Sequence, residues 1–213
     1  DHPEWAPVNR YGTRRHNGIV ALWYPEARAA LVDRYSRFMV DKGYDGIHFY
    51  TYTENLGLRY DDEFGYDPPI VEEFKRRYGV DILKEEFDAE AWVQLLGEYV
   101  TQFFRELKEA LCPHGKKIAV FIDLGDSHLT QQWGDGRRTS GRIYMDWETW
   151  ARDGIVDELV LNPRYESEEV GLREAGAVID FVSKTECRVS YGSGRADPYA
   201  PLPSGVRTRL LSP

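Results

Sequence analysis

The sequence predicts an α/β fold built around a parallel β-sheet, and three observations support this prediction. Helical and strand patterns alternate along the 213 residues. Short apolar stretches predict strands that begin near residues 46, 117, 158 and 187. One of these stretches, residues 118–122, contains no polar residue, which is typical of a strand buried on both faces of a parallel sheet.

The first predicted unit is a helix followed by a buried strand. Before it, the apolar run 18–23 predicts either an edge strand or a loop packed on the core. Apolar residues three and four apart then predict a helix over 25–41, which Gly43 ends. The Asp45-Gly46 turn leads into a strand over 46–53, rich in β-branched and aromatic residues.

A long insertion and a long helix follow. Residues 56–83 are rich in acids and rings and include a short helix that Pro68-Pro69 begins and Gly79 ends. The clearest helix covers 88–111, with Asp88 as the predicted N-cap. Its wide apolar stripe indicates that a sheet covers one face. The other predicted elements are the strand 117–122, a loop (125–143), a helix (145–153), a strand (156–162), a helix (167–184), a strand (187–191) and a final loop (196–213).

The number of strands limits the architecture. A closed eight-stranded barrel needs about 200 to 250 residues without long loops, and here two long loops use much of the length. We therefore predict a (β/α)8 TIM-barrel type of fold, present as a partial barrel with long βα loops. The chain would form the C-terminal half to two-thirds of the barrel over residues 1–195, incomplete at its N-terminus, with 196–213 as a tail.

Composition narrows the classes of partner. A hydrophobic content of 42% and a charged content of 30% are typical of soluble globular proteins. The net charge of -9 argues against a nucleic-acid partner, and no apolar stretch approaches the roughly 20 residues of a membrane helix. The chain begins with Asp1 and not Met, so we expect a fragment or a processed protein. Its localisation, export included, and its oligomeric state stay open, as does the pairing of Cys112 with Cys187.

Four stretches resemble one protein family. They are Tyr44-Asp45-Gly46-Ile47-His48-Phe49 through Asn55; His2-Pro3-Glu4-Trp5 with Tyr24-Pro25-Glu26-Ala27-Arg28; Pro69 through Asp81; and Asp146-Trp147 through Gly154-Ile155-Val156-Asp157. Together they resemble the glycoside-hydrolase-like (β/α)8-barrel proteins, often described as family-10-glycosyl-hydrolase-like. The resemblance implies a barrel that acts on or binds carbohydrate. Tyr50 stands where many relatives have an Asp, so the resemblance does not name the second carboxylate.

Two acidic residues are candidate catalytic groups. Glycosidases use one carboxylic acid to protonate the leaving oxygen and a second carboxylate as nucleophile or base. Glu54 and Asp123 each follow a predicted strand, and the carboxyl ends of parallel strands meet at one edge. We predict Glu54 as the acid/base and Asp123 as its partner. The competing interpretation is that both are loop, capping or ion-paired residues.

Further residues are predicted to bind substrate. His48 should share one strand face with Tyr50, Tyr52 and Glu54, where it could bind a sugar hydroxyl or be a buried, hydrogen-bonded core residue. For the aromatic candidates, stacking on sugar competes with core packing. The predicted binding residues are His48, Tyr50, Tyr52, Asn55, Arg59, Trp133, Tyr144, Asn162 and Tyr165.

Two alternatives to a glycosidase stay open. A non-catalytic carbohydrate-binding barrel would keep the ring-lined cleft without the second carboxylate, and Tyr50 in place of an acid favours it. A metal-dependent hydrolase would use the acidic residues Asp61, Asp62, Glu63 and Asp67, although their spacing does not match an EF-hand loop. No phosphate-loop or Gly-x-Ser-x-Gly motif is present, and we predict no cofactor.

Overall fold

A single parallel sheet organises the molecule. The computed structural model describes residues 2–16, 18–50, 64–123, 143–162, 168–191 and 207–208. Within these ranges the sheet runs in chain order, and every neighbouring pair of strands is parallel. The prediction of an α/β fold with a parallel sheet is therefore confirmed. The strands are β1 (Gly46–Phe49), β2 (Lys117–Asp123), β3 (Glu158–Asn162), β4 (Arg188–Tyr191) and β5 (Arg207–Thr208).

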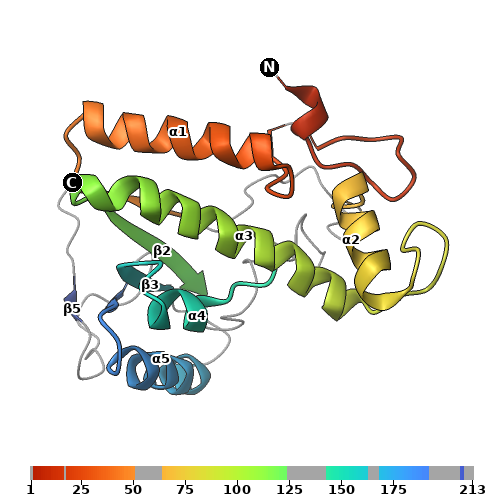
Figure 1. Ribbon diagram of the computed structural model, residues 1–213. Helices are drawn as coiled ribbons and strands as arrows, with labels where there is room; N and C mark the ends of the chain where they lie inside the picture. The colour runs from red at the N-terminus through yellow and green to blue at the C-terminus, as the bar shows by residue number, and fades with distance from the viewer. Residues whose placement is uncertain are drawn as a thin grey trace.

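The helices match their sequence signals closely (Figure 1). Asp88 caps the long third helix as predicted, because its carboxylate accepts hydrogen bonds from the Glu90 and Ala91 amides. Gly79 ends the second helix in the left-handed conformation that glycine tolerates best (φ 73°). The helical elements are η1 (Pro3–Trp5), α1 (Pro25–Asp41), α2 (Pro68–Tyr78), α3 (Ala89–Leu111), η3 (Cys112–His114), α4 (Trp147–Arg152) and α5 (Glu168–Val182).

The apolar stripe of α3 serves two hydrophobic cores. Its C-terminal half, including Phe104 and Leu107, packs with Ile118 of β2 in the core beneath the sheet. Its N-terminal half, including Trp92, packs instead with Ile70 of α2 in a second core. The prediction that a sheet covers α3 is therefore correct for the C-terminal half. Figure 1 shows α3 spanning both regions, with α2 at one end and the sheet at the other.

For one segment the structure settles an open alternative, and for another it corrects the prediction. The run 18–23 forms no strand and is a loop, with Ala21 and Trp23 buried in the second core. The tail 196–213 was predicted as loop, but Arg207–Thr208 forms β5 and extends the sheet beside β4. Pairing with a strand that is distant in the sequence leaves no local signal. The Pro and Ser content of the tail therefore predicts a loop and does not reveal the strand. The two cysteines are free, with Cys112 exposed and Cys187 buried.

Asp157, just before β3, connects three elements. Its carboxylate accepts hydrogen bonds from Lys108 Nζ of α3 (2.6 Å), from Lys117 Nζ (2.9 Å) and from the Ile118 amide of β2 (2.9 Å). Burial acts to raise the pKa of this carboxyl, but the hydrogen bonds outweigh it and hold the pKa below its ordinary value. Asp157 therefore fixes α3 against the start of the sheet.

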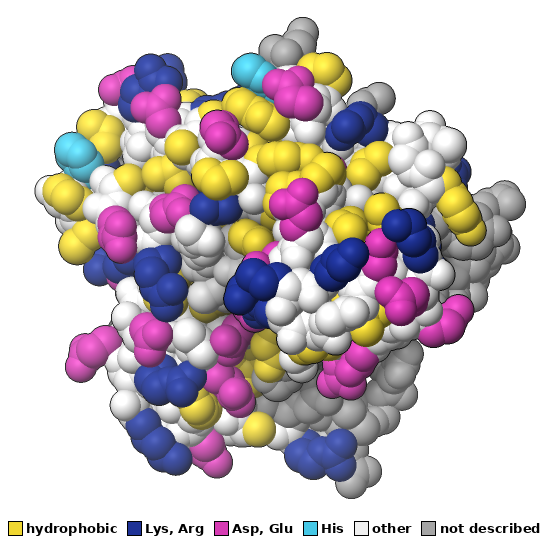
Figure 2. Space-filling view, turned by 45° about the vertical axis from the view of Figure 1, so that its right-hand side comes forward, with side chains coloured by type: hydrophobic (Ala, Val, Ile, Leu, Met, Phe, Trp, Pro, Cys, Tyr) yellow, Lys and Arg dark blue, Asp and Glu magenta, His cyan; other side chains and the backbone are white. Residues whose placement is uncertain are grey.

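The surface mixes charges of both signs. On the face in Figure 2, acidic and basic side chains alternate with hydrophobic ones, so this face carries no single-sign patch. None of the helices in the described part of the chain is long and apolar enough to cross a membrane.

Candidate functional site: the far face and the strand ends

The sheet has two faces of different character. Residues Ile118, Val120 and Ile122 of β2 pack with the helices in the larger core. Because side chains alternate along a strand, Ala119 and Phe121 belong to the opposite face. We call this opposite side of the sheet the far face. Phe121 is buried but does not belong to the larger core, in agreement with this assignment.

Strand register arranges the far face in rows. The lower row contains His48, Ala119, Glu158 and Arg188 on successive strands. The middle row contains Phe121, Val160 and Ser190. The upper row, at the carboxyl ends of the strands, pairs Asp123 with Asn162. Polar residues therefore occupy the lower and upper rows, with a mainly apolar row between them.

Tyr50 and Phe121 form an aromatic step next to the strand ends. Their rings stack with centroids 4.7 Å apart and planes 19° apart. Tyr50 follows β1 directly and keeps 62% of its surface exposed. His48 lies beside both rings, 5.2 Å from Tyr50 and 6.2 Å from Phe121. His48 and Tyr50 therefore lie side by side, although β1 ends at Phe49 and not at the predicted residue 53; Tyr52 and Glu54, expected on the same face, lie outside the described residues.

His48 titrates under two opposing influences. Partial burial lowers its pKa below the ordinary value of 6.5, since charging the ring is unfavourable where water is excluded. The negative charge of Glu158 acts in the opposite direction. The net lowering favours the neutral imidazole at pH 7, a form that can both donate and accept a hydrogen bond.

Glu158 is a buried acid that sequence reasoning missed. It is only 8% exposed, and its Oε2 accepts a hydrogen bond from Arg188 Nη2 at 3.1 Å. In the sequence it stands at the start of an apolar run and resembles a strand boundary. The alternation of residues along the strand could have revealed it. If Leu159 and Leu161 enter the core, Glu158, Val160 and Asn162 must share the opposite face.

The strand ends carry part of the predicted site. Asp123 ends β2 and Asn162 ends β3, and the two residues are partners in the ladder. The prediction that Glu54 and Asp123 share one edge of the sheet stays a prediction, because only the backbone position of Asp123 is described. The other predicted residues, Glu54, Tyr52, Asn55, Arg59, Trp133 and Tyr165, lie outside the described residues.

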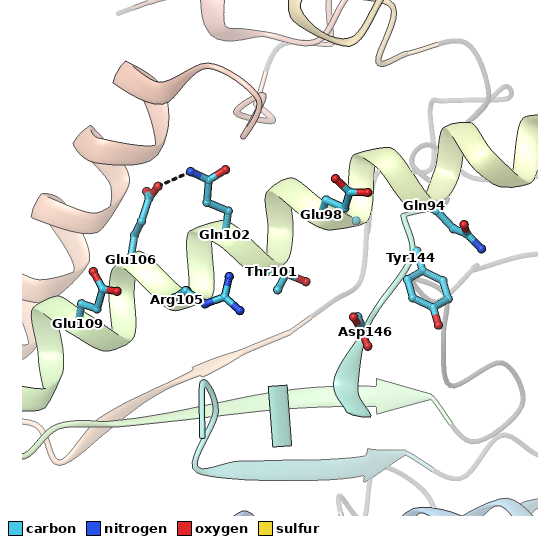
Figure 3. Close-up of a pocket in the computed structure, with 10 residues that line it drawn as sticks. Gln94, Glu98, Thr101, Gln102, Arg105, Glu106, Glu109, Tyr144 and Asp146 are labelled. Atoms are coloured by element: carbon cyan, nitrogen blue, oxygen red, sulfur yellow. Dashed lines mark hydrogen bonds between the residues drawn. The ribbon is translucent and has the colours of Figure 1, made fainter. Parts of the chain in front are cut away.

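Tyr144 lies apart from the far face. Its amide donates a hydrogen bond to the Val93 carbonyl of α3 (3.3 Å), so it belongs to the layer of helices. Figure 3 shows it beside an open groove of about 710 Å³ along α3, which also contains Thr101, Gln102 and Arg105. Burial raises the pKa of the Tyr144 hydroxyl. The structure does not bring Tyr144 together with His48 and Tyr50.

Of the four acidic residues considered for a metal site, the structure describes only one. Asp61, Asp62 and Glu63 lie outside the described residues. Asp67 is fully buried, where its carboxylate accepts hydrogen bonds from the Val8 amide and the Tyr24 hydroxyl, both at 3.2 Å. Across the described ranges, no three His, Cys, Asp or Glu side chains are grouped so that they could hold a metal ion.

Comparisons with known proteins give a distant structural likeness. No family model and no curated protein matches the sequence. Two similar solved structures are of the GH20 exo-β-N-acetylglucosaminidase from Vibrio harveyi, one in complex with N-acetylglucosamine and one an inactive mutant. Each has a TM-score of 0.40 and 11% identity, over 89% of this chain and 22% of the enzyme's chain. The chain spans about a fifth (22%) of that enzyme, and a likeness of this extent says nothing of substrate or mechanism.

Proposed function

We propose that this chain forms part of a (β/α)8-barrel glycoside hydrolase that acts on an oligo- or polysaccharide. Glu54 is the general acid/base and Asp123 the second carboxylate. The observation that carries the proposal is the shared strand edge, where Asp123 and Asn162 end neighbouring parallel strands in register. Ligands of parallel α/β folds bind at this edge, and residues from several strand ends supply the chemistry.

The rings at the same end of the sheet suit a sugar. Tyr50 is largely exposed, and its ring stacks on Phe121. A rigid aromatic surface of this kind offers a large apolar contact with little loss of conformational entropy. Neutral His48 beside it could donate to or accept from a sugar hydroxyl. The resemblance of residues 44–55 to glycoside-hydrolase-like barrels supports the same substrate class.

Matched carboxylate variants test the catalytic roles. Glu54→Gln and Asp123→Asn should each lower turnover of a responsive glycan by about 10²-fold or more, since each removes a proton-transferring or charged group. Glu186→Gln and Asp45→Asn make the same chemical changes before β4 and β1, at the amino ends of the strands. These controls should retain activity. Equal turnover in Glu54→Gln and Glu186→Gln would refute the acid/base assignment.

A non-catalytic carbohydrate-binding barrel is the second candidate. Tyr50 supports it, since an exposed aromatic ring at this position contributes to binding and cannot act as the missing carboxylate. In this case the chain binds an oligosaccharide without cleaving it, and Glu54→Gln leaves the affinity unchanged. Tyr50→Ala should weaken binding by about tenfold, whereas Tyr78→Ala, which removes a comparably exposed ring from α2, should not. Calorimetric titration together with product analysis separates the two candidates.

A further inference from the structure

The groove along α3 is bordered by two segments of the chain. One side is a stripe of α3 from Gln94 to Glu109, whose residues stand three and four apart. At 1.5 Å per residue this stripe is about 22 Å long. The other side is the segment of Tyr144 and Asp146, which crosses α3 where Gly97 has no side chain (Figure 3). The groove is therefore more than the solvated face of one helix.

The groove lies within the layer of helices and away from the sheet. All of its lining residues come from α3 or from positions 144 and 146. Arg28 of α1 bonds to Glu106 of α3 at 3.2 Å, and Trp150 of α4 bonds to Thr101 of α3 at 2.7 Å. Both neighbours of α3 in this layer are therefore present, so the groove is not an unfinished edge of the fold.

Buried residues fix two of the polar groups in the groove. The indole N–H of Trp150, which is fully buried, donates to Thr101 Oγ1, so the Thr101 hydroxyl can still donate its own proton. The Glu106 carboxylate accepts from Arg28, which is also buried, and from Gln102 Nε2 at 2.9 Å. These groups keep their positions before a ligand arrives, which lowers the entropy cost of binding.

The charges of the groove are largely compensated within the chain. Glu98 accepts from Arg77 at 2.6 Å, and Asp146 accepts from the amide of the third residue of α4 at 3.2 Å. Arg105 lies 3.6 Å from the aspartate that follows α4. A strongly charged ligand would therefore find little net charge to bind. Amides, hydroxyls and carboxylates that are already held suit a ligand with many hydroxyl groups, because each hydroxyl both donates and accepts.

We propose that the groove along α3 is a second binding site, separate from the strand ends, for a neutral oligosaccharide. Sugar hydroxyls donate to the carboxylate of Glu106 and the side-chain carbonyl of Gln102, and one accepts from Thr101. Glu109 and Tyr144 lie at the two ends of the groove (Figure 3). The site goes beyond the proposed function and does not depend on it. A polymer held here would have a raised effective concentration at the strand ends of the same molecule.

The indole N–H of Trp150 reports on the site. A ligand that bonds to Thr101 changes the acceptor of this N–H, so its NMR resonance should shift. The probes are cellopentaose, xylopentaose and maltopentaose, three neutral chains that differ in sugar or linkage. Titration in the Glu54→Gln background prevents cleavage of the probe, and Trp150→Phe identifies the resonance. At least one of the three probes should shift it in a saturable manner.

Matched double variants locate the contact. Glu109→Gln/Tyr144→Phe should weaken the binding that Trp150 reports by about tenfold, the effect of about one or two lost hydrogen bonds. Glu72→Gln/Tyr78→Phe makes the same changes of residue type at exposed positions of α2 and should leave the binding unchanged.

Tyr50→Ala separates this site from the strand ends. It removes the exposed ring beside the strand ends and should leave the Trp150 titration unchanged, even where the proposed hydrolase activity is absent. No shift of the Trp150 resonance with any probe up to about 10 mM overturns the proposal. A tighter response to spermine than to every sugar also overturns it, since the groove then selects cations. Equal weakening by the two double variants, or loss of the response in Tyr50→Ala, assigns the binding to another surface and overturns it as well.

Discussion

Replacing Gly97 by alanine should destabilise the protein, although alanine is the better helix former. Gly97 is buried in the middle of α3, where the main chain of Tyr144 crosses the helix. A methyl group at this position would lie 2.8 Å from Tyr144 Cβ and 3.0 Å from its carbonyl carbon, and closer still to the carbonyl oxygen. The obstacle is largely backbone, so no change of side-chain rotamer relieves it.

The expected loss follows from two opposing contributions. Alanine in place of glycine favours a helix by about 1 kcal/mol. Overpacking against neighbours that cannot move costs about 1 to 3 kcal/mol, and contact with backbone belongs at the upper end. The net loss is about 1 to 2 kcal/mol, which for a chain of this size lowers Tm by about 2 to 8 °C.

Gly176→Ala provides the matched control in α5. A methyl group there meets no atom within 4 Å, so this variant should gain up to about 1 kcal/mol from helix propensity alone. Urea unfolding followed by far-ultraviolet circular dichroism measures both variants. If Gly97→Ala is as stable as the parent protein while Gly176→Ala is stabilised, the close approach of Tyr144 to α3 is wrong.

Two further predictions concern charged residues. Asp157→Asn should cost about 1.5 to 3 kcal/mol at pH 7, because it breaks charge-assisted bonds to Lys108 and Lys117. The folded-state pKa of Asp157 is lowered, so this stability is present above the unfolded pKa of about 3.8 and is lost as pH falls through the folded value. The difference in free energy of unfolding between variant and parent, measured by urea unfolding, should therefore shrink as the pH falls below about 3.8. Glu158→Gln should lower the pKa of His48 further, because it removes the charge that opposes the shift, and an NMR titration showing a rise would contradict this.

Elements with strong local signals could be predicted from the sequence. Asp88 stands before an apolar stripe and marks the start of α3, and Gly79 stands after one and marks the end of α2. Both could be predicted because capping depends on neighbours within a few residues. Pairing between distant segments has no such signal. Arg207–Thr208 joins the sheet from a tail whose composition indicates loop. In α1 the predicted stripe is only partly buried: Ala27 and Met39 are buried, whereas Phe38 is 46% exposed.

The position of Tyr144 shows the same limit within the candidate site. From its residue type alone, Tyr144 is predicted to join the rings of the cleft, because composition does not tell where a ring lies. A sequence signal did exist in another element. Gly97 interrupts the helical pattern of residues 88–111, and such a glycine commonly marks the close approach of another segment. That segment is the one containing Tyr144.

The rows of the far face set Glu158 apart from the strand ends. Asp123 stands in the upper row with Asn162. Glu158 lies four residues earlier on the same strand as Asn162, which at about 3.3 Å per residue sets it about 13 Å below the strand ends. Glycosidase carboxyl groups are separated by about 5 to 10 Å, so Glu158 lies farther below the strand ends than the usual separation of the two groups. It is also bound to Arg188. Our proposal assigns the role of partner to Glu54, and the comparison of Glu54→Gln with Glu186→Gln tests this assignment directly.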